Sequence, residues 1–264
     1  MEPFAVSWTE LTIATLAAAV IALAALKRGL LDTSGALAAC LLGPALVATG
    51  GWWLGAILIA FFVSSSLLPS PATESPSRTW HQVAANGGPA LALSTIGLLT
   101  EHDRLLVGAA ATIAATTADT WATEIGRALG GVPWSLRSRS RVPAGTSGAV
   151  TPVGLFASAA GAVFIATVTI LLAPIAPVGD LDNMRTGIIV ALCGVLGSTA
   201  DTLLGATLQA RFRCKRCAEV SEDATDHRPG HPMVRISGVR WMTNSIVNLS
   251  AAAIAGLAAI ALAG

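Results

Sequence analysis

The chain has 264 residues, of which 53% are hydrophobic and 12% charged, and its mean hydropathy is +0.68. An average soluble domain carries about twice this share of charge, so the composition excludes an ordinary soluble enzyme and indicates an integral membrane protein. The formal net charge is only +1, and we expect no nucleic-acid partner.

Apolar segments of membrane-spanning length follow one another along the chain. We predict an all-α, polytopic membrane protein whose helices form one bundle in membrane lipid. Eight segments are expected, at 9–26, 35–50, 52–68, 82–100, 105–126, 149–173, 187–209 and 242–263. Residues 1–264 would form a single membrane domain, because the longest polar stretch, 210–241, is too short to hold an independent core without a metal.

Basic residues favour one side of the predicted membrane. If the chain starts outside, all of the 16 lysines and arginines except Arg104 and Arg185 lie on the inner side. Cytoplasmic loops of membrane proteins are enriched in Lys and Arg. We therefore predict a multi-pass protein of the cell membrane, with both termini outside and the 210–241 loop in the cytoplasm.

Two aspartates stand within predicted helices, each in the tetrapeptide Thr-Ala-Asp-Thr, at 117–120 and 199–202. An Asp at mid-bilayer costs about 2.5 to 3.5 kcal/mol, so it is a functional candidate by default. Both helices run inward, which places Asp119 and Asp201 at matching depth. Their alternative role is a buried structural pair, but neither predicted helix contains a Lys or Arg that could neutralise them.

The two carboxylates suit Mg²⁺, which proteins usually bind through one or two carboxylates together with substrate phosphates. We predict that Asp119 and Asp201 are catalytic residues and ligands of Mg²⁺. Glu124, on the same helix as Asp119, is a third catalytic candidate, although Arg127 at i+3 could instead pair with it.

Amides, hydroxyls and glycines of other segments fall at the same inner ends of the predicted helices. Asn86 lies one turn inside the start of the fourth segment, and Asn244 and Asn248 share one face at the start of the eighth. A glycine-rich stretch is predicted to open the sixth helix, where free N–H groups would form an anion site, and arginines precede it. These residues are Gly145, Thr146, Ser147 and Gly148, after Arg137, Arg139 and Arg141. The alternatives are interhelical hydrogen bonds for the asparagines and ordinary inner-loop charges for the arginines.

The inner loop contains Cys214 and Cys217 at CxxC spacing, followed by His227 and His231. Two thiolates and two imidazoles are a tetrahedral ligand set for Zn²⁺. We therefore predict a small structural zinc knuckle within 210–241. The alternative is a reduced cysteine pair that binds no metal.

Two common enzyme classes find no support in the sequence. The lysines, Lys27 and Lys215, do not end a glycine-rich phosphate loop of the Walker type. The four histidines all fall in predicted loops, so no Ser, His and Asp arrangement for hydrolysis is indicated.

Five blocks in order along the chain resemble the signature blocks of the transmembrane protein 19 family, also described as domain of unknown function 92. They are 78–87 (RTWHQVAANG), 118–126 (ADTWATEIG), 145–150 (GTSGAV), 201–209 (DTLLGATLQ) and 244–248 (NSIVN). This family includes a plant phytyl-phosphate kinase, so the resemblance implies a membrane kinase acting on an isoprenoid monophosphate. The two aspartate blocks also look distantly like the acidic motifs of polyprenol kinases and phosphatidate cytidylyltransferases, enzymes that use a nucleoside triphosphate and Mg²⁺.

This interpretation gives each group a role. Thr146, Ser147 and the three arginines would hold the triphosphate, and the three asparagines would hold the acceptor phosphate or the waters of the ion. Two other functions stay open. A lipid-phosphate cytidylyltransferase would use the same site and release pyrophosphate, and a membrane transporter would use the Asp pair for an ion or a proton.

Overall fold

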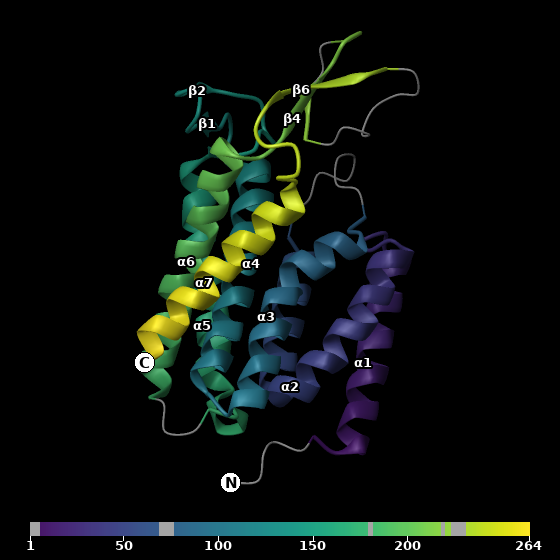
Figure 1. Ribbon diagram of the computed structural model, residues 1–264, viewed down its shortest axis with the longest axis vertical. Helices are drawn as coiled ribbons and strands as arrows, with labels where there is room; N and C mark the ends of the chain where they lie inside the picture. The colour runs from purple at the N-terminus through teal and green to yellow at the C-terminus, as the bar shows by residue number, and fades with distance from the viewer. Residues whose placement is uncertain (1–5, 69–76, 179–181, 218–219, 223–230) are drawn as a thin grey trace.

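The computed structural model describes residues 6–68, 77–178, 182–217, 220–222 and 231–264. Within these ranges the chain forms seven α-helices and two small antiparallel sheets. The helices are α1 (Trp8–Lys27), α2 (Thr33–Ser66), α3 (Trp80–Thr100), α4 (Arg104–Leu129), α5 (Pro152–Leu171), α6 (Asn183–Thr207) and α7 (Asn244–Ala263), with a 3₁₀ turn at Ala173–Ile175. The helices stand side by side, the strands lie at one end of the bundle, and α1 starts and α7 ends at the other (Figure 1).

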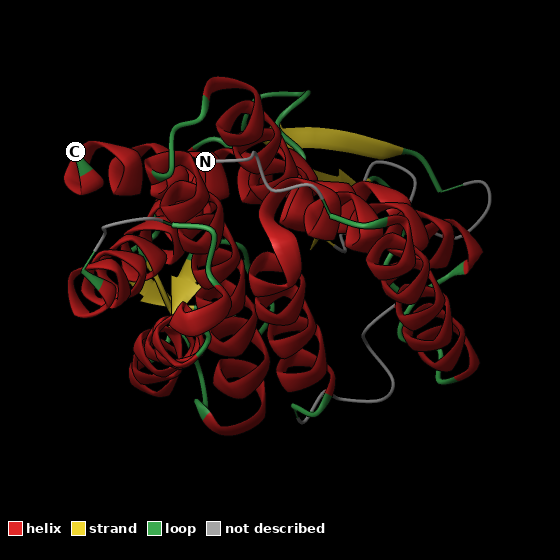
Figure 2. Ribbon diagram, turned by 90° about the horizontal axis from the view of Figure 1, so that it is seen from below, coloured by secondary structure: helices red, strands yellow, loops and turns green. Residues whose placement is uncertain are grey.

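All helices except α4 are long and apolar enough to cross a membrane by length and composition. The prediction of an all-α, polytopic membrane protein is therefore confirmed. Seen from the end where α1 starts, the helices form one bundle and the strands lie behind them (Figure 2).

The predicted helices at 35–50 and 52–68 are joined in α2, which is broken at Gly51. This residue has φ 66° and ψ −176°, outside the helical range. A Cβ on Gly55 would lie 2.6 Å from Cγ2 of Val47. On a continuous helix, residues eight apart are separated by about 12 Å. The two arms of α2 therefore fold back on each other at Gly51, and Phe62 of the second arm packs against the small hydrophobic cluster that contains Ala36 of the first.

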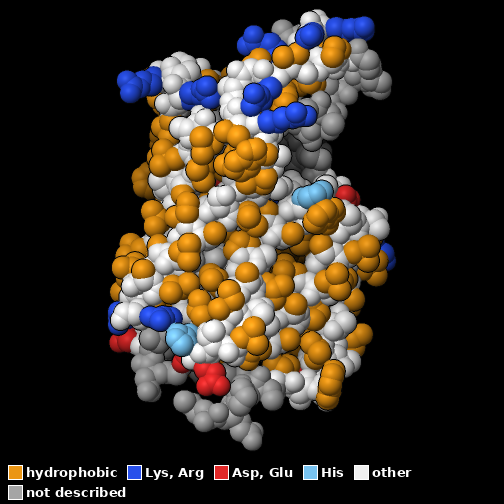
Figure 3. Space-filling model, viewed as in Figure 1, with side chains coloured by type: hydrophobic (Ala, Val, Ile, Leu, Met, Phe, Trp, Pro, Cys, Tyr) orange, Lys and Arg blue, Asp and Glu red, His pale blue; other side chains and the backbone are white. Residues whose placement is uncertain are grey.

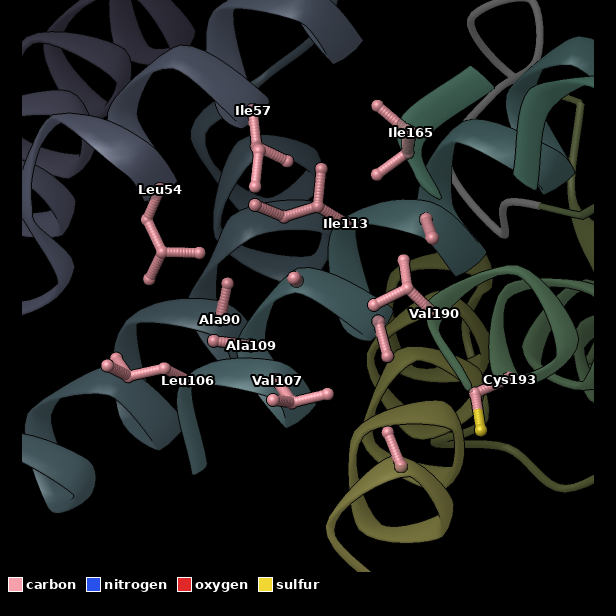
Figure 4. Close-up of a cluster of buried hydrophobic side chains, with 14 of the residues drawn as sticks. Leu54, Ile57, Ala90, Leu106, Val107, Ala109, Ile113, Ile165, Val190 and Cys193 are labelled. Carbon is pink, nitrogen blue, oxygen red and sulfur yellow. The ribbon is translucent and has the colours of Figure 1, made fainter. Parts of the chain in front are cut away.

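The core is centred on α4, which packs against α2, α3, α5, α6 and α7. Residues 106–118 of this helix are all buried, and six of these 13 residues are alanine. Small residues let membrane helices approach closely. Figure 4 shows Val107 and Ile113 of α4 within a cluster that also contains Leu54 of α2, Ile165 of α5 and Val190 of α6. The most polar long helix is thus the one most shielded from lipid.

Each sheet lies in the connection between two helices and has its first strand in the centre. Between α4 and α5, β1 (Trp134–Ser135) pairs with β2 (Ser140–Arg141) and β3 (Ala149–Val150). Between α6 and α7, β4 (Arg211–Cys214) pairs with β5 (Val220–Ser221) and β6 (Met233–Ser237).

The predicted start of the sixth segment at residue 149 is wrong. Ala149 and Val150 pair with β1, and α5 begins only at Pro152. The N-cap is Thr151, whose hydroxyl accepts a hydrogen bond from the Gly154 N–H at 3.0 Å. Pro is favoured at the first helical position because its missing N–H needs no partner there. The apolar run at 149–151 had concealed this boundary.

Side chains are sorted along the length of the bundle. Lysines and arginines gather over the strands, and hydrophobic side chains cover the middle (Figure 3). Arg185 lies at the opposite end, where its guanidinium donates to the Leu262 carbonyl at 2.9 Å. This sorting is the pattern expected of a protein that crosses a membrane and carries most of its basic residues on one side.

Candidate functional site

The structure brings the two intramembrane aspartates together. Asp119 comes from α4 and Asp201 from α6, and their carboxyl groups are within hydrogen-bonding reach of each other. Both line a small pocket together with Asn86 of α3 and Asn248 of α7. Four helices thus contribute polar groups to one point inside the bundle.

The close approach of α4 and α6 explains why the carboxyl groups meet. A Cβ on Gly197 would overlap Cβ of Ala115, so the two helices touch where this glycine has no side chain. Asp119 and Asp201 each follow one of these contact residues by four positions. Residues four apart lie on the same face of a helix, one turn on. The Ala115–Gly197 contact therefore places the two carboxyl groups side by side.

Asn248 is the amide group closest to the Asp pair. With its nitrogen facing the acids, Asn248 donates to Asp201 Oδ2 at 3.0 Å and to the Asn244 carbonyl at 2.9 Å. The opposite amide orientation leaves only a longer contact, 3.5 Å to Asn86 Oδ1. Hydrogen-bond partners decide such amide orientations. The Asn244 side chain is exposed and does not line the pocket.

Glu124 lies further along α4, with one carboxylate oxygen, Oε2, that is buried and without a hydrogen-bond partner. The charge of Arg78, just before α3, acts on it. Arg127 instead has its guanidinium 3.4 Å from the position that a Cβ on Gly145 would take. From there its charge acts on Asp119.

The glycine-rich turn is packed onto the end of α6 and does not open a helix. A Cβ on Gly148 would overlap the backbone of Ala206, and the Ser147 hydroxyl donates to Gln209 Oε1 at 2.7 Å. The N–H of Thr146 bonds to Pro143 O at 3.3 Å, that of Ala149 to Thr146 O at 3.1 Å, and that of Ser147 to the Glu222 carboxylate. The predicted set of free helix N-terminal amides is therefore wrong.

The three predicted arginines are not near the Asp pair. Arg137, Arg139 and Arg141 are exposed around the β1–β2 turn, and the Arg141 guanidinium donates to the Val132 carbonyl. Among the described residues, Arg127 is the arginine whose charge acts on Asp119, whereas Arg78 acts on Glu124. Arg127 follows Asp119 by eight positions, within the spacing of one helix face, and this signal could have identified it.

Two polar residues near the site were missed by the sequence interpretation. Gln209 is only 1% exposed, and its amide nitrogen donates to Glu222 Oε2 at 2.7 Å. Burial raises the pKa of Glu222, while the Gln209 hydrogen bond and the charges of Arg211 and Arg127 oppose that rise. Gln209 closes one of the family blocks, but Glu222 stands in a polar loop with no sequence signal.

Three of the four predicted zinc ligands converge in the second sheet. Ligand atoms of Cys214, Cys217 and His231 all lie within 4.8 Å of one another, and Cys214 Sγ is 3.6 Å from His231 Nδ1. Burial raises the pKa of the Cys214 thiol, but hydrogen bonds with the N–H groups of Cys217 and Arg216 and with the side chains of Cys217 and His231 together lower the pKa to about 7. His227 lies outside the described residues.

The bundle and its internal polar pocket define a polytopic α-helical membrane protein. The family described as integral membrane protein DUF92 matches residues 16–256, so the chain belongs to this family. The family resemblance of the five sequence blocks is thereby confirmed.

Two relatives illustrate the spread of similar sequences. Protein PGR of Arabidopsis thaliana is 29% identical over 268 residues, covering 90% of this chain and 91% of the relative. An uncharacterized membrane protein of Methanocaldococcus jannaschii is 27% identical over 210 residues, covering 76% of this chain and 84% of the relative. No solved structure matches the chain.

Proposed function

We propose that this protein is a membrane-embedded kinase that transfers a phosphoryl group from a nucleoside triphosphate to an isoprenoid monophosphate such as phytyl phosphate. The observation that carries the proposal is the meeting of Asp119 and Asp201 inside the bundle, towards its basic end. Two buried carboxylates side by side repel each other unless a proton or a cation lies between them.

The donor set fits Mg²⁺. Carboxylate, amide and water oxygens are the ligands that this ion prefers. Asp119 and Asp201 would hold the ion, Asn86 and Asn248 would orient its waters or the acceptor phosphate, and Glu124 would assist. When bound, Mg²⁺ would neutralise the charge of the phosphates. The remaining basic charge would come from Arg127, with the exposed arginines at 137, 139 and 141 and the turn at 145–148 meeting the nucleotide only at the rim.

The chemistry demands little else from the protein. A phosphate monoester acceptor is already an anion, so phosphoryl transfer depends on positioning and charge neutralisation more than on a general base. A pocket without histidine is compatible with this reaction.

Transport is the less favoured function. Residues 106–118 of α4, between the Asp pair and the start of that helix, are all buried, and six of the 13 are alanine. The hydroxyls of Thr112, Thr116 and Thr117 in this segment donate to carbonyls of the same helix. Such packing offers no polar route for an ion through the described part of the bundle. Cytidylyl transfer would use the same pocket and differs only in which phosphorus is attacked.

An assay on the purified protein in nanodiscs tests the proposal. With Mg²⁺, phytyl monophosphate and a nucleoside triphosphate labelled at the γ position, we expect label in a prenyl diphosphate. Transfer of an α label with release of pyrophosphate would establish cytidylyl transfer instead. Absence of any transfer from ATP, CTP, GTP or UTP to a range of lipid monophosphates would overturn both enzymatic functions.

We propose that the sheets face the cytoplasm of a cell, with the termini outside, because lysines and arginines gather over the strands. Cys217 is exposed on this side, whereas Cys193 is buried in α6. After metal removal, an impermeant thiol reagent should modify Cys217 only from the cytoplasmic face of oriented vesicles. Modification only from the outer face would invert this topology.

We also propose that the second sheet binds a structural Zn²⁺ through Cys214, Cys217 and His231, with His227 as the predicted fourth ligand. The three ligand atoms lie within 4.8 Å of one another, so a small approach would bring them to the separations of tetrahedral coordination. Purified protein should contain about one zinc per chain. Cys217→Ser should lose it and Cys40→Ser, within α2, should keep it; equal metal content in both variants would contradict the assignment.

A further inference from the structure

A second cavity lies beside the Asp pocket, between α1, both arms of α2 and the start of α3. Its walls are apolar: Ala17 of α1, Leu42 and Phe62 of the two arms of α2, and other side chains of the same kind. The polar side chains in its lining are Arg78 and Asn86. Helix α1 stands at the edge of the bundle (Figure 1), so the cavity lies in the outermost layer of helices, next to where lipid would be.

The cavity and the Asp pocket share a wall. Asn86 lines both, so the apolar space ends where the pocket that holds Asp119 and Asp201 begins. A molecule that filled both would have a hydrocarbon part in the first and a polar head in the second. This is the shape of a single-chain amphiphile.

Arg78 supplies the positive charge that such a head group requires. Its backbone is fixed, because its N–H donates to Leu30 O at 3.0 Å and its carbonyl accepts from the Asp32 N–H at 3.2 Å. Among the described residues, no hydrogen bond is formed by its half-buried guanidinium. The acidic group that acts on it is Glu124, whose own Oε2 lacks a partner. A guanidinium with unfilled donors at the edge of an apolar cavity is well suited to a phosphate.

We propose that this cavity binds the hydrocarbon chain of the lipid monophosphate substrate, with the phosphate held between Arg78 and Asn86 beside the Asp pair. The identity of the head group rests on the proposed function, whereas the position of the chain rests on the cavity. Ala17 then determines the chain length that the protein accepts, because its small side chain leaves the space next to α2 open to a long chain. The chain would enter from the lipid past α1, and the phosphate would remain at the level of Asn86.

Binding without nucleotide tests the position of the chain. The probe is phytyl monophosphate that carries a diazirine at the far end of its chain, added to the protein in nanodiscs and activated by light. We expect the modified residues to lie in α1 and α2. Modification confined to α5, α6 or α7 would overturn the proposal.

Matched variants on one helix sharpen the test. Ala17→Trp fills the cavity, whereas Ala19→Trp puts the same side chain on the exposed face of α1. Ala17→Trp should weaken phytyl monophosphate binding by about tenfold or more and leave dimethylallyl monophosphate binding within about twofold. Arg78→Gln should weaken the binding of both by about tenfold or more, since a charge-assisted hydrogen bond is lost. Ala19→Trp should change neither.

The outcomes separate this inference from the proposed function. Binding that follows these variants without phosphoryl transfer from any nucleotide would retain the chain site and remove the kinase. Phosphoryl transfer that is insensitive to Ala17→Trp would retain the kinase and remove the chain site. An Ala17→Trp protein that elutes as an aggregate is replaced by Ala17→Leu, for which the same selective loss of the longer chain is expected.

Discussion

Helices α4 to α7 and the two sheets form two helix–sheet–helix units, called here the first and second halves, and the two differ in the residues they bring to the site. The first half is α4, the β1–β3 sheet and α5; the second is α6, the β4–β6 sheet and α7. Each carries Thr-Ala-Asp-Thr in its first helix, has the first strand of its sheet in the centre, and begins its last helix after a threonine N-cap. The shared plan explains why the two aspartates meet as a pair.

The halves differ in what they add to that pair. In the second half, the fifth residue after the N-cap is Asn248, which donates to Asp201. The corresponding residue of the first half is Phe156, which is exposed. In the first half α4 continues past Asp119 with Glu124 and Arg127, whereas α6 ends at Thr207. The repeated Thr-Ala-Asp-Thr motif therefore supplies the Asp pair at the centre of the site. Residues that are not repeated differ on the two sides of the pair, with Asn248 on one side and Glu124 and Arg127 on the other.

The largest effect is expected when the repeated residue is changed in either half. Asp119→Asn and Asp201→Asn should each lower phosphoryl transfer by on the order of a thousandfold or more, because loss of a metal ligand removes several kcal/mol of transition-state stabilisation. Initial rates with γ-labelled nucleotide measure this. Asp103→Asn and Asp182→Asn, at the opposite ends of the same two helices, serve as controls. Activity close to wild type in either pocket variant would remove that half from the reaction.

A smaller effect should distinguish the two halves. Asn248→Leu removes the amide that donates to Asp201 and should lower the rate by roughly tenfold to a hundredfold, the value of a hydrogen bond to a charged group. Phe156→Leu, at the corresponding place, should change the rate by less than about twofold, because an exposed side chain holds no catalytic group there. Equal losses in the two variants would contradict the asymmetry.

Stability should depend on how each sheet is attached to the end of α6. Gly148 of the first half and Gly238 of the second both have positive φ, and a Cβ on either would overlap backbone atoms of residues 206–210. Gly148→Ala and Gly238→Ala should therefore each destabilise the protein by about 3 kcal/mol or more. Gly131 has φ +67° with open space around it, so Gly131→Ala should cost only about 1 kcal/mol. Thermal unfolding in one detergent compares the three, and equal melting temperatures would show that the contacts are not close.

The smallest effect is expected on the pH dependence of stability. It concerns Glu222 of the second half, which accepts a hydrogen bond from the Ser147 N–H of the first half. Its pKa is raised above the ordinary 4.5 by burial, near the charges of Arg127, Arg211 and Asp201. Folding thus favours the protonated, neutral form of Glu222. Its contribution to the stability of the folded protein is full below pH 4.5 and is lost as the pH rises through the raised pKa. Glu222→Gln should be increasingly more stable than wild type as the pH approaches neutrality. A difference in melting temperature that does not change with pH would contradict this expectation.

The sequence predicts the bundle well because apolar segments of spanning length carry most of the information. It also predicts that Asp119, Asp201, Asn86 and Asn248 point to one place, since depth in the membrane follows from helix direction. It fails where tertiary contacts decide. The turn at 145–148 looks like a helix start, but its amides bond to carbonyls and to Glu222. The roles of Gln209 and Glu222 depend on the pairing of β4 with β5, which the polar loop does not reveal.

The fold-back of α2 at Gly51 determines at which end of the bundle α1 starts. Helix α1 starts and α7 ends at the same end of the bundle, which requires an even number of passages along it, yet the described chain contains seven helices. The two arms of α2 count as a descent and a return, and they restore the even number. A straight α2 would place the start of α1 at the opposite end of the bundle while leaving α3 to α7 in position. A single glycine with positive φ thus determines whether the number of passages along the bundle is even or odd. It also keeps α1 beside the cavity that this helix helps to line.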